Sequence, residues 1–204
     1  REVAMQTSVA RVEHRTAVVA TVVAAFRQDP AFRFFFPDDE RYEAEAAVFS
    51  GYLFDKRVGH GTIWTIDDAA SVAMWSPPTA AGVEPADAAA AQAGVPGSDG
   101  GAAERIQHYE SIVDEALPEM PHWYLGILAT HPDHAGRRLG RRVMRDGLAA
   151  AYADGVPAVL ETTRADNVAL YQRAGWSVDR ELVVDDLDVW ILSHPGEPSA
   201  PESG

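Results

Sequence analysis

The chain of 204 residues contains no cysteine. Disulfide bonds, thiolate metal sites and acyl transfer through a cysteine are therefore excluded. No stretch approaches the ~18 consecutive apolar residues of a transmembrane helix, and the N-terminal residues do not resemble a signal peptide. From these absences we expect a cytoplasmic protein without a membrane partner.

Positive charge is also scarce. Lys and Arg number 17 against 31 Asp and Glu, which gives a formal net charge of −14. A general nucleic-acid surface needs Lys and Arg spread over it, so we expect no nucleic-acid partner. The acidic composition suits a cationic or amine-bearing partner, although acidity that only serves solubility would look the same.

The hydrophobic content of 47% is sufficient for a core, and the length fits one domain. Alternating and apolar runs predict strands at residues 3–8, 62–65, 71–75, 123–130, 158–163, 177–182 and 188–192. Helical spacing predicts helices at residues 12–27, 38–58, 103–117, 136–154 and 167–174. The order of these elements predicts an α/β (mixed α+β) fold, a mixed sheet with helices on both faces.

The domain organisation follows from composition along the chain. Residues 79–101 are rich in Ala, Gly and Pro, which predicts a flexible insertion rather than a domain boundary. Residues 194–204 are polar and contain proline, so we expect a disordered tail. Residues 1–193 are therefore expected to form a single domain that carries the insertion.

Basic residues are concentrated between residues 123 and 145. The predicted strand at 123–130 ends before Pro132, and from Gly136 the pattern becomes helical. A strand that leads into a helix through a glycine-containing turn leaves backbone N–H groups free at the positive end of the helix dipole. We therefore predict an anion site, most often for phosphate, surrounded by five arginines: Arg137, Arg138, Arg141, Arg142 and Arg145.

Two segments of this region resemble the GCN5-related N-acetyltransferases (GNAT). Residues 135–140, AGRRLG, resemble the family's Gln/Arg-x-x-Gly-x-Gly/Ala motif for acetyl-CoA, with Ala135 in place of Gln or Arg and Arg138 in place of the first glycine. Residues 160–163, LETT, and 167–176, NVALYQRAGW, resemble the later N-x-x-x-x-Y-x-x-x-G-F/W segment. With DPAFRFFFPDD at residues 29–39, the pattern is most similar to puromycin N-acetyltransferase-like proteins.

The resemblance implies the GNAT fold, with a central twisted mixed sheet of about six or seven strands. It also implies acetyl-CoA as acyl donor, with its pyrophosphate on the loop before the helix and its pantetheine arm beside the strand that precedes it, where the fourth and fifth strands part. The expected cofactor-binding residues are Leu128, Ala129, Thr130, Gly136, Arg137, Arg138, Leu139, Gly140, Arg141 and Asn167. For any single arginine, a solvated helix face is the alternative.

Tyr171 and Glu161 are the candidate catalytic residues. Tyr171 lies four residues after Asn167, so both occupy one side of a short helix. The resemblance implies that the Tyr171 hydroxyl points at the thioester sulfur as general acid; the alternative is a packed tyrosine with its hydroxyl in water. Glu161 ends a strand, where partial desolvation would raise its pKa and suit a base acting directly or through water. The alternative is a buried acid satisfied by backbone donors.

Other residues leave more than one interpretation open. Phe32, Phe34, Phe35 and Phe36 either fill the core between two helices or form a wall of an acceptor pocket. His108 and His122 are further candidates for that pocket, with ordinary surface or core positions as the alternative. His131 and His134 lie in a loop with no third ligand nearby, so we expect no metal site.

These features together predict an N-acetyltransferase that moves acetyl from acetyl-CoA directly to a primary amine of a small molecule. The acceptor could be a puromycin-like aminonucleoside or another antibiotic or metabolite, which would make the enzyme one of antibiotic resistance. A non-catalytic acyl-CoA-binding module and a protein or peptide N-acetyltransferase are the alternatives. Ala135 and Arg138 favour the binding module, whereas Glu161, Asn167 and Tyr171 oppose it. The protein is expected to be a monomer or a homodimer.

Overall fold

The computed structural model describes residues 6–79 and 101–198. Nearly all of the expected insertion near residues 79–101 and the end of the expected tail lie outside the described residues. Within the described ranges, no helix combines the length and the apolar character required to cross a bilayer.

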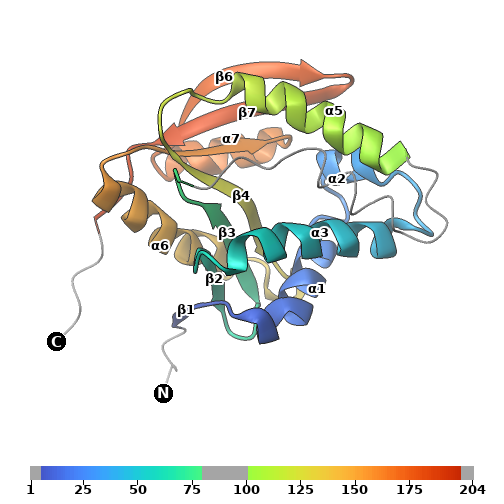
Figure 1. The fold of residues 1–204 in the computed structure, drawn as a ribbon, viewed down its shortest axis with the longest axis horizontal. Helices are drawn as coiled ribbons and strands as arrows, with labels where there is room; N and C mark the ends of the chain where they lie inside the picture. The colour runs from blue at the N-terminus through green and yellow to red at the C-terminus, as the bar shows by residue number, and fades with distance from the viewer. Residues whose placement is uncertain (1–5, 80–100, 199–204) are drawn as a thin grey trace.

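One mixed sheet of seven strands forms the centre of the molecule (Figure 1), in the order β1-β2-β3-β4-β5-β7-β6. Neighbouring strands are antiparallel except for β4 and β5, which are parallel. The strands are β1 Thr7–Val9, β2 Ile63–Ile66, β3 Ser71–Ser76, β4 Trp123–Thr130, β5 Ala158–Thr162, β6 Ser177–Val184 and β7 Leu187–His194. The predicted mixed α/β fold is confirmed.

Helices cover both faces of the sheet (Figure 1). On one face lie α1 Arg15–Ala25, α2 Pro30–Phe35, α3 Tyr42–Val58 and α5 Gly101–Ala116. On the other lie α6 Leu139–Asp154 and α7 Ala165–Arg173. Short 3-10 helices at Val12–His14 and Pro132–His134 precede α1 and α6. Each face has its own buried cluster of apolar side chains, so the sheet is sandwiched between two cores.

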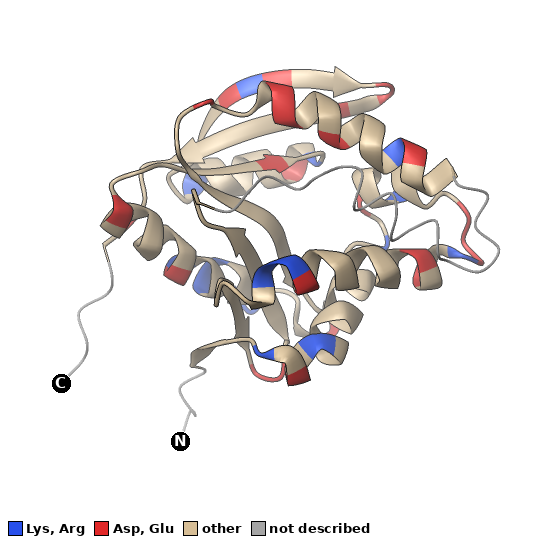
Figure 2. Cartoon of the chain, viewed as in Figure 1, with Lys and Arg blue, Asp and Glu red and all other residues tan. Residues whose placement is uncertain are grey.

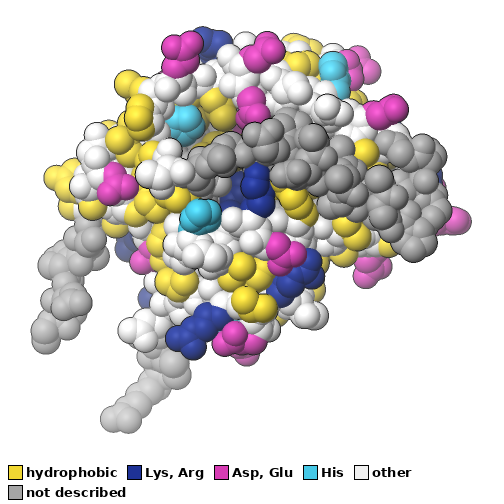
Figure 3. All heavy atoms as spheres, viewed as in Figure 1, with side chains coloured by type: hydrophobic (Ala, Val, Ile, Leu, Met, Phe, Trp, Pro, Cys, Tyr) yellow, Lys and Arg dark blue, Asp and Glu magenta, His cyan; other side chains and the backbone are white. Residues whose placement is uncertain are grey.

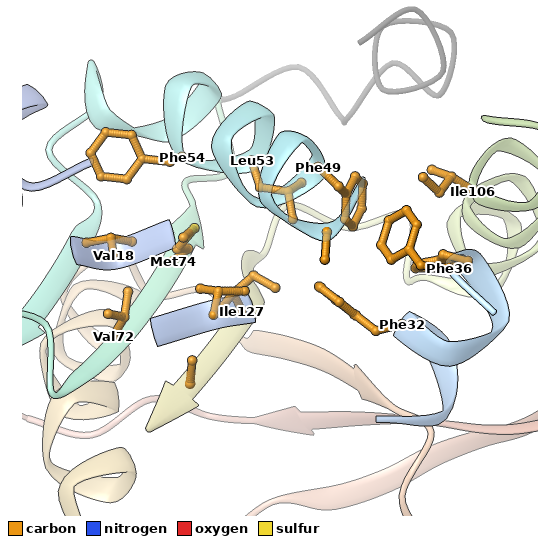
Figure 4. Close-up of a cluster of buried hydrophobic side chains, with 14 of the residues drawn as sticks. Val18, Phe32, Phe36, Phe49, Leu53, Phe54, Val72, Met74, Ile106 and Ile127 are labelled. Atoms are coloured by element: carbon orange, nitrogen blue, oxygen red, sulfur yellow. The ribbon is translucent and has the colours of Figure 1, made fainter. Parts of the chain in front are cut away.

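The phenylalanines of α2 and its C-cap residue Phe36 belong to the core on the α3 side (Figure 4). Phe32, Phe35 and Phe36 are buried, and their rings lie 5.7–5.9 Å from the ring of Phe49 on α3. Phe34 is only partly buried. The core interpretation of this aromatic segment is therefore confirmed for three of its four members.

The helix predicted at residues 12–27 ends at Ala25, and a further helix, α2, begins at Pro30. Asp29 caps α2, because its Oδ1 accepts hydrogen bonds from the backbone N–H groups of Ala31 (3.0 Å) and Phe32 (3.2 Å). Pro30 occupies the first turn, where its missing N–H costs nothing. The Asp-Pro pair thus starts α2, a helix that the sequence pattern did not predict, whereas α1 already ends at Ala25.

Candidate active site

The parallel strands β4 and β5 pair at one end only. Trp123 is opposite Ala158 and Tyr124 is opposite Val159, after which the strands diverge. Trp123 holds the paired end: its backbone N–H donates to Pro157 O (2.9 Å) and its indole Nε1 donates to Asp154 (2.8 Å). The parting of the fourth and fifth strands that the resemblance implied is therefore present.

A β-bulge at Gly126 reverses the alternation of β4 just beyond this point. Met74 of β3 pairs with Ile127 and Trp75 pairs with Leu125, so Gly126 has no partner in β3. Before the bulge, Trp123 and Leu125 are buried on the α6 side; after it, Ile127 and Ala129 are buried on the α3 side. Side chains between these positions point the opposite way. Tyr124 therefore faces α3 and α5, whereas Leu128 and Thr130 face α6.

Two chambers lie where the strands part. The first, of about 640 Å³, is enclosed by α2, α3, α5 and the diverging strands, and we call it the α5 chamber. The second, of about 700 Å³, lies between β4, α6 and α7, and we call it the α6 chamber. Four residues belong to the walls of both chambers: Leu128, Thr130, Asn167 and Tyr171. The two predicted helix residues, Asn167 and Tyr171, thus lie at the junction.

The α6 chamber contains the start of the arginine-rich helix, and here one expectation was wrong. A helical backbone was predicted from Gly136, but α6 begins at Leu139. Two residues before α6 have a left-handed backbone, a conformation that favours glycine: Gly136 (φ +79°) and Arg138 (φ +58°), which is the N-cap of α6. The motif that residues 135–140 resemble has glycine at this position, and the positive φ explains why. In this chain Arg138 adopts the same conformation with a larger side chain, at a cost in backbone strain.

The α6 chamber fits a phosphate-bearing ligand. Arg138, Arg141 and Arg173 line it, and the backbone N–H groups in the first turn of α6 have no intrahelical acceptor. Gly140 leaves space beside β4, because a Cβ at this position would lie 3.5 Å from Thr130 Oγ1 and fill the gap. Anionic oxygens would therefore meet both arginines and oriented backbone donors.

The predicted cofactor-binding residues separate into two groups. Leu128, Thr130, Arg138, Gly140, Arg141 and Asn167 line the α6 chamber. The side chains of Ala129 and Leu139 are instead buried in the two cores, and Arg137 lies on the exposed side of the loop, where its Nη1 is 2.9 Å from His134 Nδ1. Gly136 is exposed and also lies outside the chamber walls. A role for these last four in cofactor binding stays a prediction.

Glu161 lies in the wall of the α5 chamber. Its Oε2 accepts a hydrogen bond from the Tyr124 hydroxyl at 2.5 Å. Burial raises the pKa of the Glu161 carboxyl to about 7, and the hydrogen bond from Tyr124 opposes part of that rise. A carboxylate that titrates near neutral pH can accept a proton and release it again.

A second carboxyl and a buried guanidinium face the same chamber. Burial, followed by the charges of Asp114 and Glu161, raises the pKa of Glu110 to about 8. Among the described residues, the buried Glu110 Oε2 has no hydrogen-bond partner. Arg57 is only 3% exposed; it donates to Ser76 Oγ and to Leu53 O, each at 3.0 Å. Burial lowers the pKa of Arg57.

Tyr171 stands between the chambers with its ring packed against Trp176, at 5.8 Å between centroids. Burial raises the pKa of its hydroxyl above the ordinary value, so the side chain stays protonated at physiological pH. Of the predicted acid and base, Tyr171 thus lies at the junction, whereas Glu161 lines the α5 chamber alone and is near enough for its charge to raise the pKa of the Tyr171 hydroxyl.

The remaining candidates are placed as follows. Phe32, Phe35 and His122 line the α5 chamber, so these phenylalanines are both core and pocket wall. His108 does not line it; its Nε2 lies 3.3 Å from Asp185 Oδ1 on the exposed side of α5. Over the described ranges, no three His, Asp or Glu side chains gather as metal ligands would.

Sequence reasoning missed Tyr124, Arg57 and Glu110. Tyr124 lies in the predicted strand at residues 123–130, and a strand pattern does not reveal a bulge. Glu110 carried a signal, since it is four residues after Ile106 and three before Val113 and therefore lies on the apolar face of α5. Arg57 near the end of α3 resembles an ordinary basic residue of a last helical turn.

Charges around the chambers differ in sign. Figure 2 shows mainly acidic positions along α5, and both basic and acidic positions along α6 and at the C-terminal end of α3. Acidic side chains outnumber basic ones in the wall of the α5 chamber, even when Glu110 is protonated: Asp29, Glu110, Asp114, Glu119 and Glu161 against Arg57, Arg164 and His122. On the face in Figure 3, acidic and basic side chains are interspersed. The α5 chamber therefore favours a cation and the α6 chamber an anion.

Comparison with known proteins agrees with this geometry. Residues 104–176 match the model of the Acetyltransferase (GNAT) family. A Corynebacterium glutamicum structure described as histone acetyltransferase HPA2 and related acetyltransferase superimposes with a TM-score of 0.68 at 20% identity, over 97% of this chain and 98% of that one.

Two insect enzymes are also similar in structure. The polyamine N-acetyltransferase of Drosophila melanogaster has a TM-score of 0.65 at 17% identity, over 93% of this chain and 98% of its own. Arylalkylamine N-acetyltransferase 2 of Aedes aegypti has a TM-score of 0.66 at 10% identity, over 94% and 99%. At these identities the likeness shows a shared fold. Residues 104–176 thus match the Acetyltransferase (GNAT) family, and the chain shares its fold with these acetyltransferase structures.

Proposed function

We propose that the protein transfers acetyl from acetyl-CoA directly to a primary amine of a small molecule. The observation that carries this proposal is the junction of two chambers of opposite charge at Asn167 and Tyr171. The donor would occupy the α6 chamber and the amine the α5 chamber, so that the reacting groups meet where the walls are shared.

The residues that would hold acetyl-CoA are those of the α6 chamber. Arg138 and Arg141, with the first N–H groups of α6, would bind its phosphates, and Leu128 and Thr130 would lie beside the pantetheine arm. When bound, acetyl-CoA supplies an activated acyl group on a thiol leaving group. The other steps depend on this chain's own residues.

Glu161 and Tyr171 would move the two protons of the reaction. An amine reaches the α5 chamber mainly as an ammonium ion, and Glu161, with a pKa of about 7, accepts its proton and frees the nitrogen lone pair. As the new C–N bond forms and the C–S bond breaks, Tyr171 donates its hydroxyl proton to the sulfur. The attacking nitrogen still carries one proton too many for an amide, and it loses this proton to solvent as the C–S bond breaks. The proton held by Glu161 then returns through solvent to Tyr171, which restores both side chains.

The α5 chamber indicates a small cationic acceptor. Its volume of about 640 Å³ is that of a pocket for a small molecule. Its carboxylates favour an ammonium group, and Phe32, Phe35 and Phe49 give it an apolar floor. The structural neighbours named for polyamine and arylalkylamine acetylation are consistent with such an acceptor. A puromycin-like aminonucleoside, and with it antibiotic resistance, is supported by the sequence motifs alone.

The test is thiol release from acetyl-CoA with a panel of puromycin, aminoglycosides, polyamines, arylalkylamines and short peptides. Because the protein has no cysteine, a thiol reagent reports only the product. We expect turnover with one class of small amine, and a fall of about a hundredfold or more in kcat/KM for Glu161→Gln. Glu115→Gln, an exposed carboxyl on α5, is the matched control and should leave the rate unchanged.

Two outcomes would contradict the proposal. Turnover with peptides alone would indicate a protein or peptide acetyltransferase. Tight acetyl-CoA binding in calorimetry without turnover for any acceptor would favour a non-catalytic acyl-CoA-binding module.

A further inference from the structure

We propose that Tyr124 is a positioning residue for Glu161, and that its hydroxyl holds the carboxylate in the α5 chamber for proton transfer from the acceptor. This inference rests on the proposed role of Glu161 as base. Tyr124 itself belongs to the strand beside the donor, so the same strand would orient both the donor and the base.

The strand register brings the two side chains together. Tyr124 pairs with Val159 in the last rung shared by β4 and β5, and Glu161 is two residues further along β5. Residues two apart on a strand point to the same face, and a long aromatic side chain reaches its diagonal neighbour across a pair of strands. The resulting hydrogen bond, from the hydroxyl to Oε2, is 2.5 Å long.

Gly126 and Arg57 keep Tyr124 in this position. A Cβ at residue 126 would lie 2.7 Å from Arg57 Nη2 and 3.3 Å from Tyr124 Cε1. The guanidinium and the phenol ring therefore both occupy space that only glycine leaves open. Arg57 is in turn held by hydrogen bonds to Ser76 and Leu53. Packing against Gly126 and Arg57 thus orients the Tyr124 hydroxyl toward Glu161.

Several ionisable groups face Glu161, and they act in opposite directions. Burial and the charges of Asp114 and Glu110 oppose the ionisation of Glu161. The hydrogen bond from Tyr124, the backbone N–H of Glu161 itself and the charge of Arg57 favour it. The hydroxyls of Tyr109 and Tyr171, both above their ordinary pKa, are neutral neighbours near physiological pH. Asp29, Glu119, His122 and Arg164 complete the titratable wall of the chamber. The Tyr124 hydroxyl donates a hydrogen bond directly to the carboxylate.

Tyr124→Phe separates positioning from packing, because the ring stays and only the hydroxyl is lost. A hydrogen bond to a charged group favours the charged form, so its loss should raise the pKa of Glu161 by about one unit. The acidic limb of the kcat/KM profile is expected to move up by the same amount, which lowers the rate at pH 6 by about tenfold and the high-pH plateau by less. Tyr152→Phe, on the exposed surface of α6, is the matched control and should leave the limb in place.

A direct titration makes the test independent of turnover. The Glu161 carboxyl, followed by NMR in protein labelled with 13C at glutamate side chains, should show the same rise in pKa in Tyr124→Phe. An unmoved carboxyl pKa, or a lower one, would overturn the inference. In a Glu161→Gln background, Tyr124→Phe should add no further loss of rate; independent, multiplying losses would also overturn it. If Glu161→Gln alone keeps full activity, the proposed base is wrong, and the titration still decides whether Tyr124 controls the carboxylate.

Discussion

Glutamine in place of Glu110 should make the folded protein more stable at high pH. Burial raises the pKa of Glu110 to about 8 from an ordinary value of 4.5, so the folded state binds this proton more tightly than the unfolded state. Its contribution to stability is complete below the unfolded-state pKa and is lost progressively as the pH rises to about 8. A neutral amide of the same shape is free of this loss.

The magnitude follows from the shift in pKa. A rise from 4.5 to about 8 corresponds to a loss of about 5 kcal/mol in the free energy of unfolding. Glu161 ionises over the same range and repels Glu110, so part of this loss is shared between the two groups. We therefore expect Glu110→Gln to recover about 2–4 kcal/mol at pH 9 and little at pH 4.5.

Urea unfolding followed by tryptophan fluorescence measures this difference at both pH values. The control is Glu115→Gln on the same helix, where the carboxyl is exposed and the free energy of unfolding should match the wild type at both pH values. If wild type and Glu110→Gln lose the same free energy of unfolding between pH 4.5 and pH 9, the carboxyl is not held in its protonated form by burial, and the reasoning fails.

Three further substitutions test the site. Tyr171→Phe should lower kcat by about 10- to 100-fold while calorimetry finds an unchanged Kd for acetyl-CoA; an unchanged kcat would disprove the acid assignment. Arg138→Gly relieves a left-handed residue and should raise the unfolding free energy by up to about 1 kcal/mol, yet weaken acetyl-CoA binding; a lower Tm would contradict the strain. Gly126→Ala should displace the Arg57 guanidinium and cost about 1–3 kcal/mol in urea unfolding, with a lower kcat/KM at pH 7; wild-type values would show that the space is not needed.

Much of the fold could be predicted because its signals are local. The apolar run at residues 123–130 lies between two prolines, and β4 spans those residues, Trp123–Thr130. The strands β2 and β3, the arginine-rich helix and the C-terminal strands were also expected. The predicted and observed ends of an element differ where one or two backbone dihedral angles decide the conformation. At Arg138 the positive φ delays the start of α6 from the predicted Gly136 to Leu139.

The site was predicted only where its residues belong to one continuous segment. Glu161, Asn167 and Tyr171 lie within eleven positions of one another and carry a family pattern. Tyr124 reaches the site through strand register and Glu110 through the packing of α5, two features that depend on residues far away in the chain. Sequence periodicity therefore indicated which side chains are apolar, but not that a bulge turns one part of β4 toward the base and the other toward the donor.

The single paired end of β4 and β5 gives the molecule a mechanical property. Beyond Tyr124 the strands β4 and β5 diverge, and they stay joined only at the end where Trp123 contacts Asp154 and Pro157. We call these three residues the hinge. Thr130 lies about 20 Å from this hinge, so a rotation of about 5° would move it by about 2 Å. Opening at the reacting centre can thus be set by three residues that line neither chamber. Substitutions at the hinge would change the width of the opening between β4 and β5, and so which amines fit, although the hinge residues do not contact the amine.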